Sequence, residues 1–360
     1  MKIFIGAENA ITPLGNSVEE NFQSLCDGVS GIRLYKNAGF NKEDVYLSKT
    51  SFDTEHLFQT LLENCLEGLK SRIDTSIIKS PKTILILSTT KADVQNHLVD
   101  AIEISTAKLK EQLELFQPPI VVCNACTSGL QAINLAADFI TAGLYEHAIV
   151  VGCDVISDFI LYGFQSLFAI SNEPCKPFSE HRKGLTLGEA CAVVVLSKSE
   201  AVYQQTPMQY IAGSSSNDAN HISGPSRTGE GLYRSVVKTL AAAQMNSNDI
   251  DFISAHGTAT VYNDEMESIA FDRLAMNNIP LNSFKGYFGH TLGAAGVLET
   301  VICMQSLRKN LLIKSMGYTE PGTSKALDLL IENKHTDVNT ILKTASGFGG
   351  ANASLIISKR

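Results

Sequence analysis

Short apolar segments alternate with amphipathic segments along most of the chain. Residues 83–87 and 147–152 have the length and apolar composition of buried strands, whereas residues 54–71 and 231–243 carry apolar side chains at helical spacing. Such alternation is typical of α/β proteins, in which helices cover the faces of a sheet. The sequence therefore predicts an α/β sandwich built on largely parallel sheets.

A weak internal repeat indicates that this sandwich is duplicated. Residues 126–129 (Cys-Thr-Ser-Gly) open one expected helix and residues 290–293 (His-Thr-Leu-Gly) open another, with Thr second and Gly fourth in both. A chain of 360 residues can hold two such halves. We expect an N-terminal half over residues 1–205, which carries a reactive cysteine, and a C-terminal half over residues 206–360, which carries two reactive histidines.

Composition limits the class of protein. Hydrophobic residues make up 44% of the chain and charged residues 18%, so a large core can form. No apolar run approaches the roughly 20 residues of a membrane span, and the strand-like start at residues 1–5 does not resemble a signal peptide. The eight cysteines are scattered, several of them in apolar segments, which favours a reducing, cytoplasmic location without disulfides. A net charge of −8 disfavours nucleic acid or anionic membrane as the main partner.

Cys126 lies where an apolar strand at residues 120–122 gives way to a helical pattern after Gly129. A cysteine at the start of a helix is close to free backbone N–H groups and to the positive end of the helix dipole, and both favour a thiolate. A free cysteine titrates at roughly 8.5, and such a position can lower this pKa by one or more units. Most cysteines in such a chain are only small buried thiols, so the interpretation depends on what surrounds Cys126.

Three turns further along the chain supply possible partners. His256 follows an apolar strand, at the end where α/β sheets place their ligands. His290 enters a helix through a Gly- and Ala-rich loop, where the helix dipole disfavours an imidazolium and leaves a neutral ring that can donate an N–H to an oxyanion. Residues 346–350 form a glycine turn that can bring backbone N–H groups close to a ligand. A lone histidine is more often structural, but two of them together with Cys126 favour a catalytic site.

These motifs occur in an order that resembles the β-ketoacyl-acyl carrier protein synthases, the elongating Cys-His-His type of condensing enzyme. The matching segments cover the chain from end to end: residues 11–20, 125–129, 176–178, 188–190, 256–258, 263–264, 285–296 and 347–350. The resemblance implies a duplicated thiolase-like fold, a five-layer αβαβα sandwich. It also implies an acyltransferase activity, the decarboxylative Claisen condensation of an acyl thioester with malonyl-acyl carrier protein in fatty acid, polyene or polyketide-type chain elongation.

The resemblance further implies residue roles. Cys126 would hold the acyl chain as a thioester, while His256 and His290 promote malonyl decarboxylation and stabilise the enolate. The other implied roles are support of the histidines by Lys285, Glu299 and Asp264, an oxyanion hole from the backbone N–H groups of Cys126 and Phe348, gating of acyl entry by Phe348, and contact of Thr258 and Thr260 with the phosphopantetheine arm. We expect no metal and no cofactor beyond the 4′-phosphopantetheine arm that carries the substrates on acyl carrier protein.

The chain departs from the family pattern at three places. Ala259 stands where a second glycine is usual, and Cys153-Asp154 stand where Gly followed by Glu or Ala is common. The segment between residues 87 and 126 is shortened, and residues 104–119 read as a charged, helix-like stretch. Because that region shapes the acyl pocket and the dimer interface in the family, chain length and dimer geometry do not carry over. The shortening hints at a specialised synthase for a polyene pigment or another secondary lipid.

Three alternatives stay open at this point. Cys123 and Cys126 form a C-x-x-C pair, but no second pair or matching histidine spacing supports a zinc or redox site. A non-catalytic partner subunit, which sets chain length inside a ketosynthase heterodimer, would share the fold. A thiolase acting on coenzyme A esters would also share it, although thiolases use a second cysteine where this chain has His290.

The expected partners are an acyl carrier protein and a second subunit, either a copy of this chain or a related ketosynthase. Acyl carrier proteins are acidic, so docking to a chain of net charge −8 requires a local basic patch. The sequence offers five candidates for this patch: Lys70, Arg72, Lys176, Arg182 and Lys183.

Overall fold

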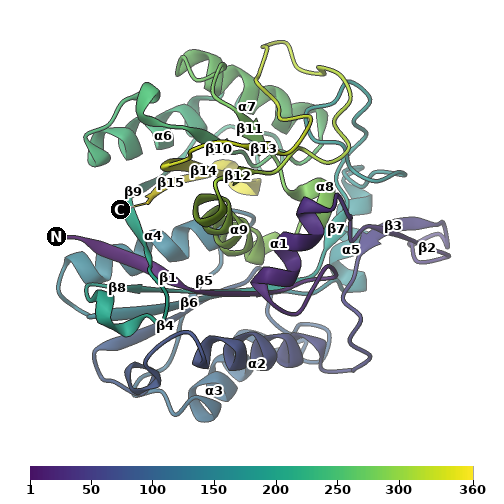
Figure 1. The fold of residues 1–360 in the computed structure, drawn as a ribbon. Helices are drawn as coiled ribbons and strands as arrows, with labels where there is room; N and C mark the ends of the chain where they lie inside the picture. The colour runs from purple at the N-terminus through teal and green to yellow at the C-terminus, as the bar shows by residue number, and fades with distance from the viewer. Residues whose placement is uncertain (360) are drawn as a thin grey trace.

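The structure is a computed structural model, and it describes residues 1–359 (Figure 1). The α-helices are α1 (Val18–Cys26), α2 (Leu57–Lys70), α3 (Ala101–Gln112), α4 (Ser128–Thr141), α5 (Asp158–Ser166), α6 (Glu230–Ala243), α7 (Val261–Arg273), α8 (Lys285–Phe288) and α9 (Ala295–Lys309). The strands of the main sheet are β1 (Ile3–Ile11), β4 (Thr83–Ser88), β5 (Ile120–Val122), β6 (His147–Asp154), β8 (Ala190–Ser197), β9 (Met208–Asn217), β10 (Phe252–Ser254), β11 (Leu281–Asn282), β14 (Thr340–Gly347) and β15 (Ala351–Ser358).

Two small sheets flank the main one. The first joins β2 (Arg33–Tyr35), β3 (Val45–Ser48) and β7 (Leu187–Gly188), and the second pairs β12 (Leu311–Leu312) with β13 (Lys334–His335). In Figure 1 the β2–β3 hairpin projects from the right-hand side of the molecule.

The main sheet contains the same arrangement twice. Its ten strands have the order β11-β10-β14-β15-β9-β1-β8-β6-β4-β5. The boundary between the two halves runs between β9 and β1. The five strands of the N-terminal half lie on the β1 side of this boundary, and the five strands of the C-terminal half lie on the β9 side. When the main-sheet strands of each half are counted along the chain, both halves read 3-2-4-5-1 from the outer edge to the junction. The duplication predicted from the short sequence repeat is therefore confirmed, and the expected boundary at residue 205 lies between β8 and β9.

The expectation of largely parallel sheets is wrong for part of each half. In the N-terminal half β4 pairs in parallel with β5 and β6, but β8 is antiparallel to both β6 and β1. The C-terminal half repeats this pattern, with β15 antiparallel to β14 and β9. Strands β14 and β15 are joined only by the turn at residues 348–350. A connection that short can join antiparallel strands only, since a parallel pair needs a long crossover.

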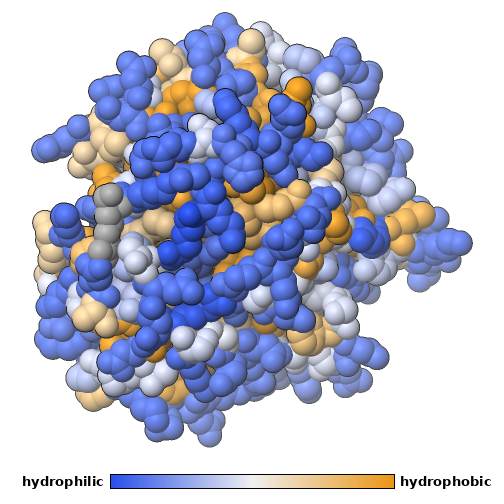
Figure 2. Space-filling view, in the orientation of Figure 1, coloured by the Kyte–Doolittle hydropathy of each residue, from blue (hydrophilic) through white to orange (hydrophobic). Residues whose placement is uncertain are grey.

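Five layers are stacked in the molecule, as the resemblance implied. Helix α2 packs on β1 and β8, and α6 packs on β9 and β15, so these helices belong to the two outer layers. Helices α4 and α9 lie between the two halves of the sheet, where α4 contacts β6 and β9 and α9 contacts β8 and β14. Figure 1 shows the layers in sequence from α2 and α3 at the bottom to α6 and α7 at the top. The same face in Figure 2 is mainly hydrophilic, with hydrophobic residues scattered between the layers.

The two central helices touch at their N-terminal ends. A Cβ atom added to Gly129 of α4 would lie 2.6 Å from the Val297 nitrogen, and one added to Gly296 of α9 would lie 2.5 Å from the Leu130 nitrogen. Real Cβ atoms do not approach backbone so closely, so this contact requires glycine on both sides. The contact fixes the segments before the two helices, which carry Cys126 and His290, against each other.

Several expected elements differ in extent. The charged, helix-like stretch at residues 104–119 is helical only in part, because α3 covers Ala101–Gln112. Helix α7 begins at Val261 with Thr260 as its N-cap. Helix α5 was not expected. Within residues 1–359 no helix combines the length and the apolar character that a membrane crossing requires.

Candidate active site

Cys126 sits in a tight turn between β5 and α4. Ala125 adopts a left-handed conformation (φ 48°), which aims the next residue inward. The Ser128 hydroxyl holds the turn, since it accepts a hydrogen bond from the Asn124 N–H at 2.7 Å and donates one to the Ala125 carbonyl at 2.6 Å. The Cys126 side chain is thereby buried, with 7% of the residue exposed.

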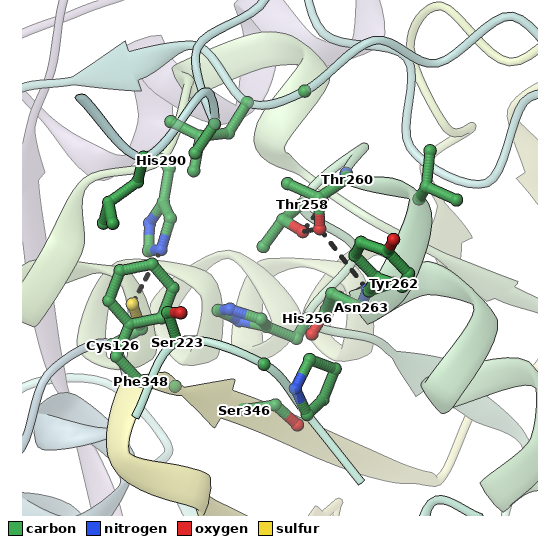
Figure 3. Close-up of a pocket in the computed structure, with 18 of the residues that line it drawn as sticks. Cys126, Ser223, His256, Thr258, Thr260, Tyr262, Asn263, His290, Ser346 and Phe348 are labelled. Atoms are coloured by element: carbon green, nitrogen blue, oxygen red, sulfur yellow. Dashed lines mark hydrogen bonds between the residues drawn. The ribbon is translucent and has the colours of Figure 1, made fainter. Parts of the chain in front are cut away.

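The Cys126 thiol lies within reach of three N–H groups. His290 Nε2 is 3.0 Å from Cys126 Sγ, and the two point toward each other in Figure 3. Burial raises the pKa of the Cys126 thiol to about 11, although Lys285 and the backbone N–H groups of Phe348 and Cys126 act in the opposite direction. The expectation of a lowered pKa is therefore wrong. Desolvation of the buried thiol raises its pKa by more than the helix N-terminus lowers it, and this burial could not be predicted from the local sequence.

The two histidine rings come from the C-terminal half and meet at the thiol. His256 follows β10 and His290 precedes α9, and their ring centroids are 5.3 Å apart at an interplanar angle of 83°. Burial, followed by the charge of Lys285, lowers the pKa of each ring well below its ordinary value. Both imidazoles are therefore neutral at pH 7.

Hydrogen bonds at Nδ1 fix the tautomer of both rings. The Leu292 N–H donates to His290 Nδ1 at 3.2 Å, and the Lys285 ammonium lies 3.3 Å from His256 Nδ1. Because each Nδ1 faces a donor, the ring hydrogen is on Nε2 in both residues. The site thus presents two Nε2–H donors, as the sequence predicted for a group that stabilises an oxyanion.

Two buried carboxylates shape the loop that carries His256. Glu267 accepts hydrogen bonds from the His256 and Gly257 N–H groups at 2.8 and 2.6 Å, and Asp264 accepts from the Thr258 N–H at 3.0 Å. Burial and the neighbouring Asp264 raise the pKa of Glu267 to about 7. Asp264 thus supports the loop, as expected. Glu267 was missed, although it lies three residues further along the same helix.

A chain of ion pairs lies behind the histidines. The Lys285 ammonium donates to the His256 carbonyl and to Glu299 Oε1, each at 2.7 Å. This geometry is consistent with the predicted support of the histidine pair by Lys285 and Glu299. Lys343 of β14 also contacts Glu299, at 2.7 Å from Oε2, and no sequence motif had singled it out. The one available signal was that Lys343 is the only charged residue of its strand.

A cavity of about 460 Å³ opens onto Cys126, His256 and His290. Thr258 and Thr260 line it, and their hydroxyls lie 2.9 Å apart (Figure 3). Apolar side chains from α5 and the segment after it line another part of the wall: Phe164, Leu167 and Phe168. Phe348 stacks on Phe164 with ring centroids 5.6 Å apart, so a movement of the Phe348 ring would break this stack. The cavity lining includes six of the predicted site residues: Cys126, His256, Thr258, Thr260, His290 and Phe348. Lys285, Glu299 and Asp264 are not part of this lining.

Ala259 differs from the glycine that is usual in the family, and Arg182 lies in a different environment from the one that we expected. Ala259 has a left-handed backbone (φ 63°), which explains why glycine is usual there. Arg182 was expected on a docking surface, but only 8% of it is exposed and its guanidinium donates to the carbonyls of Ser179, Val261 and Gly322. Its assignment to the docking surface is wrong, because Arg182 holds together the loops beside the pocket.

The other expected docking residues are mostly paired on the surface. Lys70 contacts Glu67, Arg72 contacts Glu19 and Lys176 contacts Glu173. Lys183 also lies near Glu173, at 3.3 Å, but its side chain is 58% exposed and it lines the cavity mouth. Of the five candidates, Lys183 alone lines the cavity that reaches Cys126.

The fold and the site together define a class of protein. The thiolase-like fold is a duplicated αβαβα sandwich with two central helices. In this chain a cysteine precedes one central helix and a histidine precedes the other. Within that class, residues 100–201 match the family model "Beta-ketoacyl synthase, N-terminal domain" and residues 209–319 match "Beta-ketoacyl synthase, C-terminal domain". The chain belongs to the β-ketoacyl synthase family.

Curated relatives agree with this family. The chain is 31% identical over 273 residues to 3-oxoacyl-[acyl-carrier-protein] synthase 2 of Rhizobium meliloti, which covers 72% of this chain and 65% of the relative. It is 33% identical to Nodulation protein E of Rhizobium leguminosarum bv. trifolii, over 68% of this chain and 62% of that protein. These two matches therefore span less than two thirds of the relatives. A putative mitochondrial 3-oxoacyl-[acyl-carrier-protein] synthase of Schizosaccharomyces pombe matches over 99% of both chains at 26% identity.

Solved structures share the whole fold. A ketosynthase in complex with its chain length factor from Xenorhabdus doucetiae superimposes with a TM-score of 0.90, at 26% identity and over 100% of this chain and 98% of that chain. A type II polyketide ketosynthase bound to its acyl carrier protein gives a TM-score of 0.91 at 19% identity, over 100% of this chain and 99% of that chain, and supports the fold alone.

Proposed function

We propose that this protein is an acyltransferase of the 3-oxoacyl-[acyl-carrier-protein] synthase type, which extends an acyl chain by decarboxylative Claisen condensation. The observation that carries the proposal is the convergence of Cys126 Sγ with the Nε2–H groups of His256 and His290 in one buried pocket. This arrangement supplies a soft nucleophile and two neutral hydrogen-bond donors, the groups that thioester exchange and enolate stabilisation require.

In the first half-reaction the acyl group moves from the phosphopantetheine sulfur to Cys126. The Cys126 S–C bond forms, the original thioester bond breaks, and the thiol proton ends on the departing pantetheine sulfur. The backbone N–H groups of Cys126 and Phe348 stabilise the oxyanion of the tetrahedral intermediate. Both already face the thiol, which supports their assignment as the oxyanion hole.

In the second half-reaction malonyl-acyl carrier protein binds and loses carbon dioxide. The enolate oxygen accepts hydrogen bonds from His256 and His290, and the enolate carbon attacks the thioester carbonyl held on Cys126. The new C–C bond forms as the C–S bond to Cys126 breaks, and the released thiolate takes up one proton. A Cys126 pKa of about 11 favours that uptake, so the enzyme returns to its thiol form at pH 7.

The supporting residues act around this centre. Thr258 and Thr260 offer hydroxyls to the phosphopantetheine arm from one side of the pocket, and Phe348 gates the apolar side lined by Phe164. The apolar lining fits a hydrocarbon chain but does not select among fatty acid, polyene and polyketide substrates. Turnover rates measured with acyl thioesters of graded length and unsaturation would distinguish these three substrate classes.

We propose that the reaction needs no metal or nucleotide. Cys126, His256 and His290 offer ligand atoms within 4.8 Å of one another, a grouping that could in principle hold a metal ion. A metal would need the lone pair of Nε2, whereas both Nδ1 atoms face donors and place the hydrogen on Nε2. The donor set therefore fits hydrogen-bond donation better than ligation.

We propose acyl carrier protein and a ketosynthase-family subunit, identical or related, as partners in the cytoplasm. The solved relatives include a ketosynthase with a chain length factor and one with an acyl carrier protein. The exposed Lys183 at the cavity mouth is the remaining candidate contact for an acidic carrier. A non-catalytic role as a chain-length subunit is disfavoured, because Cys126, His256, His290 and Lys285 are all present and in contact.

Mass spectrometry tests the proposal directly. After incubation with an acyl-carrier protein, Cys126 should carry the acyl mass, and Cys126→Ala should carry none and lose condensation. Cys126→Gln should keep or raise malonyl decarboxylation while condensation is abolished. Condensation that persists in Cys126→Ala would contradict the mechanism.

A further inference from the structure

Lys343 is a fully buried cation behind the active site. Its ammonium ion-pairs with Glu299 Oε2 at 2.7 Å and donates hydrogen bonds to the carbonyls of Ser254, Ala255 and Thr344, at 3.1, 3.1 and 2.8 Å. Every atom that Nζ contacts there is an acceptor. Burial lowers the pKa of Lys343, but the Glu299 carboxylate acts in the opposite direction and stabilises the ammonium form. Taking an ammonium out of water is costly unless it is paired and hydrogen-bonded, and Lys343 meets both conditions.

Glu299 receives one lysine at each carboxylate oxygen. Lys285 lies 2.7 Å from Oε1 and Lys343 lies 2.7 Å from Oε2. Burial would raise the pKa of Glu299, but the two ammonium groups outweigh it and hold the pKa below its ordinary value. Glu299 is thus ionised, and the three side chains together carry one net positive charge in a site that water does not reach.

Both arms of this network reach the segment that leads into His256. Lys285 bonds the His256 carbonyl and faces His256 Nδ1, while Lys343 bonds the carbonyls of the two preceding residues, Ser254 and Ala255. Lys343 therefore fixes the end of β10 from one side and orients the Glu299 carboxylate from the other. If Lys343 were absent, Glu299 could turn toward Lys285 alone, and the cluster would have no net charge.

We propose that Lys343 is a positioning residue for malonyl decarboxylation, a role that rests on the proposed function. It holds Glu299 so that Lys285 faces His256 Nδ1, and it supplies the uncompensated positive charge of the cluster. That charge keeps His256 and His290 as neutral Nε2–H donors and favours the enolate that forms in front of them. Lys343 itself touches no substrate, because it lies in β14 with no exposed surface.

The direction of the electrostatic effect follows from the groups around the two rings. The titratable groups around the network, besides the two rings, are Cys126, Asp154, Cys175, Arg182, Asp264, Glu267, Lys285, Glu299, Cys303 and Lys343. Burial is the main cause of the low pKa of each ring, and Lys285 and Lys343 both lower it further. Removal of the Lys343 charge should therefore raise the pKa of both rings.

Ring titration by NMR tests this effect without any substrate. We would label the histidines with ¹⁵N and assign the two rings with His256→Gln and His290→Gln. In the wild type both rings should be Nε2–H tautomers and neutral at pH 6.5. In Lys343→Met the titration midpoints should move upward, and Lys343→Gln should move them the same way, because glutamine keeps donors but not the charge. Lys343→Gln also serves if Lys343→Met fails to fold.

Kinetics give the second readout. In both Lys343 variants kcat for decarboxylation should fall about 10- to 100-fold, by analogy with the loss seen when a hydrogen-bonding partner of a metal-bound histidine is removed. The KM for the malonyl substrate should stay unchanged, and the acidic limb of the kcat profile should move to higher pH. Arg308→Met is the matched control, because it removes a different cation, which lies on α9 and pairs with Glu8 at 2.9 Å. This variant should show the ring titrations and the pH profile of the wild type.

Wild-type ring titrations and wild-type kcat in both Lys343 variants would overturn the proposal. A wild-type ring that titrates near pH 6.5 would overturn it as well. Failure of the proposed function has a different signature: the wild-type protein would show no decarboxylation and no acyl-Cys126, while the ring titrations would still report whether Lys343 controls the histidines.

Discussion

Gly129→Ala should separate the two halves of the active site. The new Cβ would lie 2.6 Å from the Val297 nitrogen, and relief to an ordinary contact of about 3.4 Å requires α4 and α9 to part by about 0.8 Å. Cys126 and His290 lie just before these helices, with Sγ and Nε2 3.0 Å apart. A separation of that size would stretch this contact to about 3.8 Å and weaken it. Since a misplacement near 1 Å can cost about 10²-fold in rate, we expect condensation to fall by one to two orders of magnitude.

The stability of the variant should fall as well. Overpacking of a tight core contact costs about 1–3 kcal/mol, and here the clashing atoms are backbone, which has little freedom to move aside. Because the chain contains no tryptophan, far-UV circular dichroism in a urea titration is the suitable measurement. The midpoint should shift to lower urea.

Gly143→Ala provides the control for this prediction. Gly143 follows α4 at its other end, with a left-handed backbone (φ 73°) and open space around its Cα, so alanine there should cost about 1 kcal/mol of backbone strain without moving the helix start. It should lose stability but keep its kcat. If Gly129→Ala keeps wild-type kcat and a wild-type midpoint, the close approach of α4 and α9 does not position the catalytic groups.

Three further predictions concern the ionisable groups. His256→Ala and His290→Ala should each lower the rate of malonyl decarboxylation about 10²- to 10³-fold, because each variant loses one hydrogen-bond donor to the oxyanion. Carbon dioxide release measures this rate, and a variant that decarboxylates as fast as the wild type would contradict the prediction. Because the pKa of each ring lies well below its ordinary value, decarboxylation by Cys126→Gln should stay constant from pH 8 down to about 6.5, and a decline centred near 6.5 would contradict the assigned protonation state. Burial raises the pKa of Glu267 from 4.5 to about 7, so the native state binds more protons than the unfolded state between these values and stability falls as pH rises through this window. Glu267→Gln should flatten that part of the melting-temperature profile, and an unchanged slope would show that another group is responsible.

Local sequence was sufficient where the determining interactions are local. The helical spacing of apolar side chains over residues 231–243 predicted α6, which covers Glu230–Ala243. The motifs around Cys126, His256 and His290 located a pocket because each follows a strand or opens a helix, and the α/β architecture brings those ends together. Resemblance to a known family then supplied the five layers, which alternation alone did not define.

Long-range interactions account for the errors. The pKa of Cys126 depends on burial under residues far away in sequence, so its position near a helix start gave the wrong sign. Arg182 looked like a surface charge because nothing near it shows that carbonyls from three separate segments surround its guanidinium. Lys343 acquires its partners only when β14 lies beside β10 and α9. In each case the missing information was the environment that the rest of the chain creates.

The place of β1 in the sheet has a consequence for the order of folding. Ile5 pairs with both Leu196 and Met208, so β1 lies at the centre of the finished sheet and joins its two halves. Its neighbours on both sides are made much later than β1 itself, and β9 in turn pairs with β15, which follows later still. Loop-closure entropy makes such distant pairings slow. Strand β1 must therefore wait, with its edges unpaired, until β8 and β9 have been made, and unpaired strand edges make a nascent chain prone to aggregation.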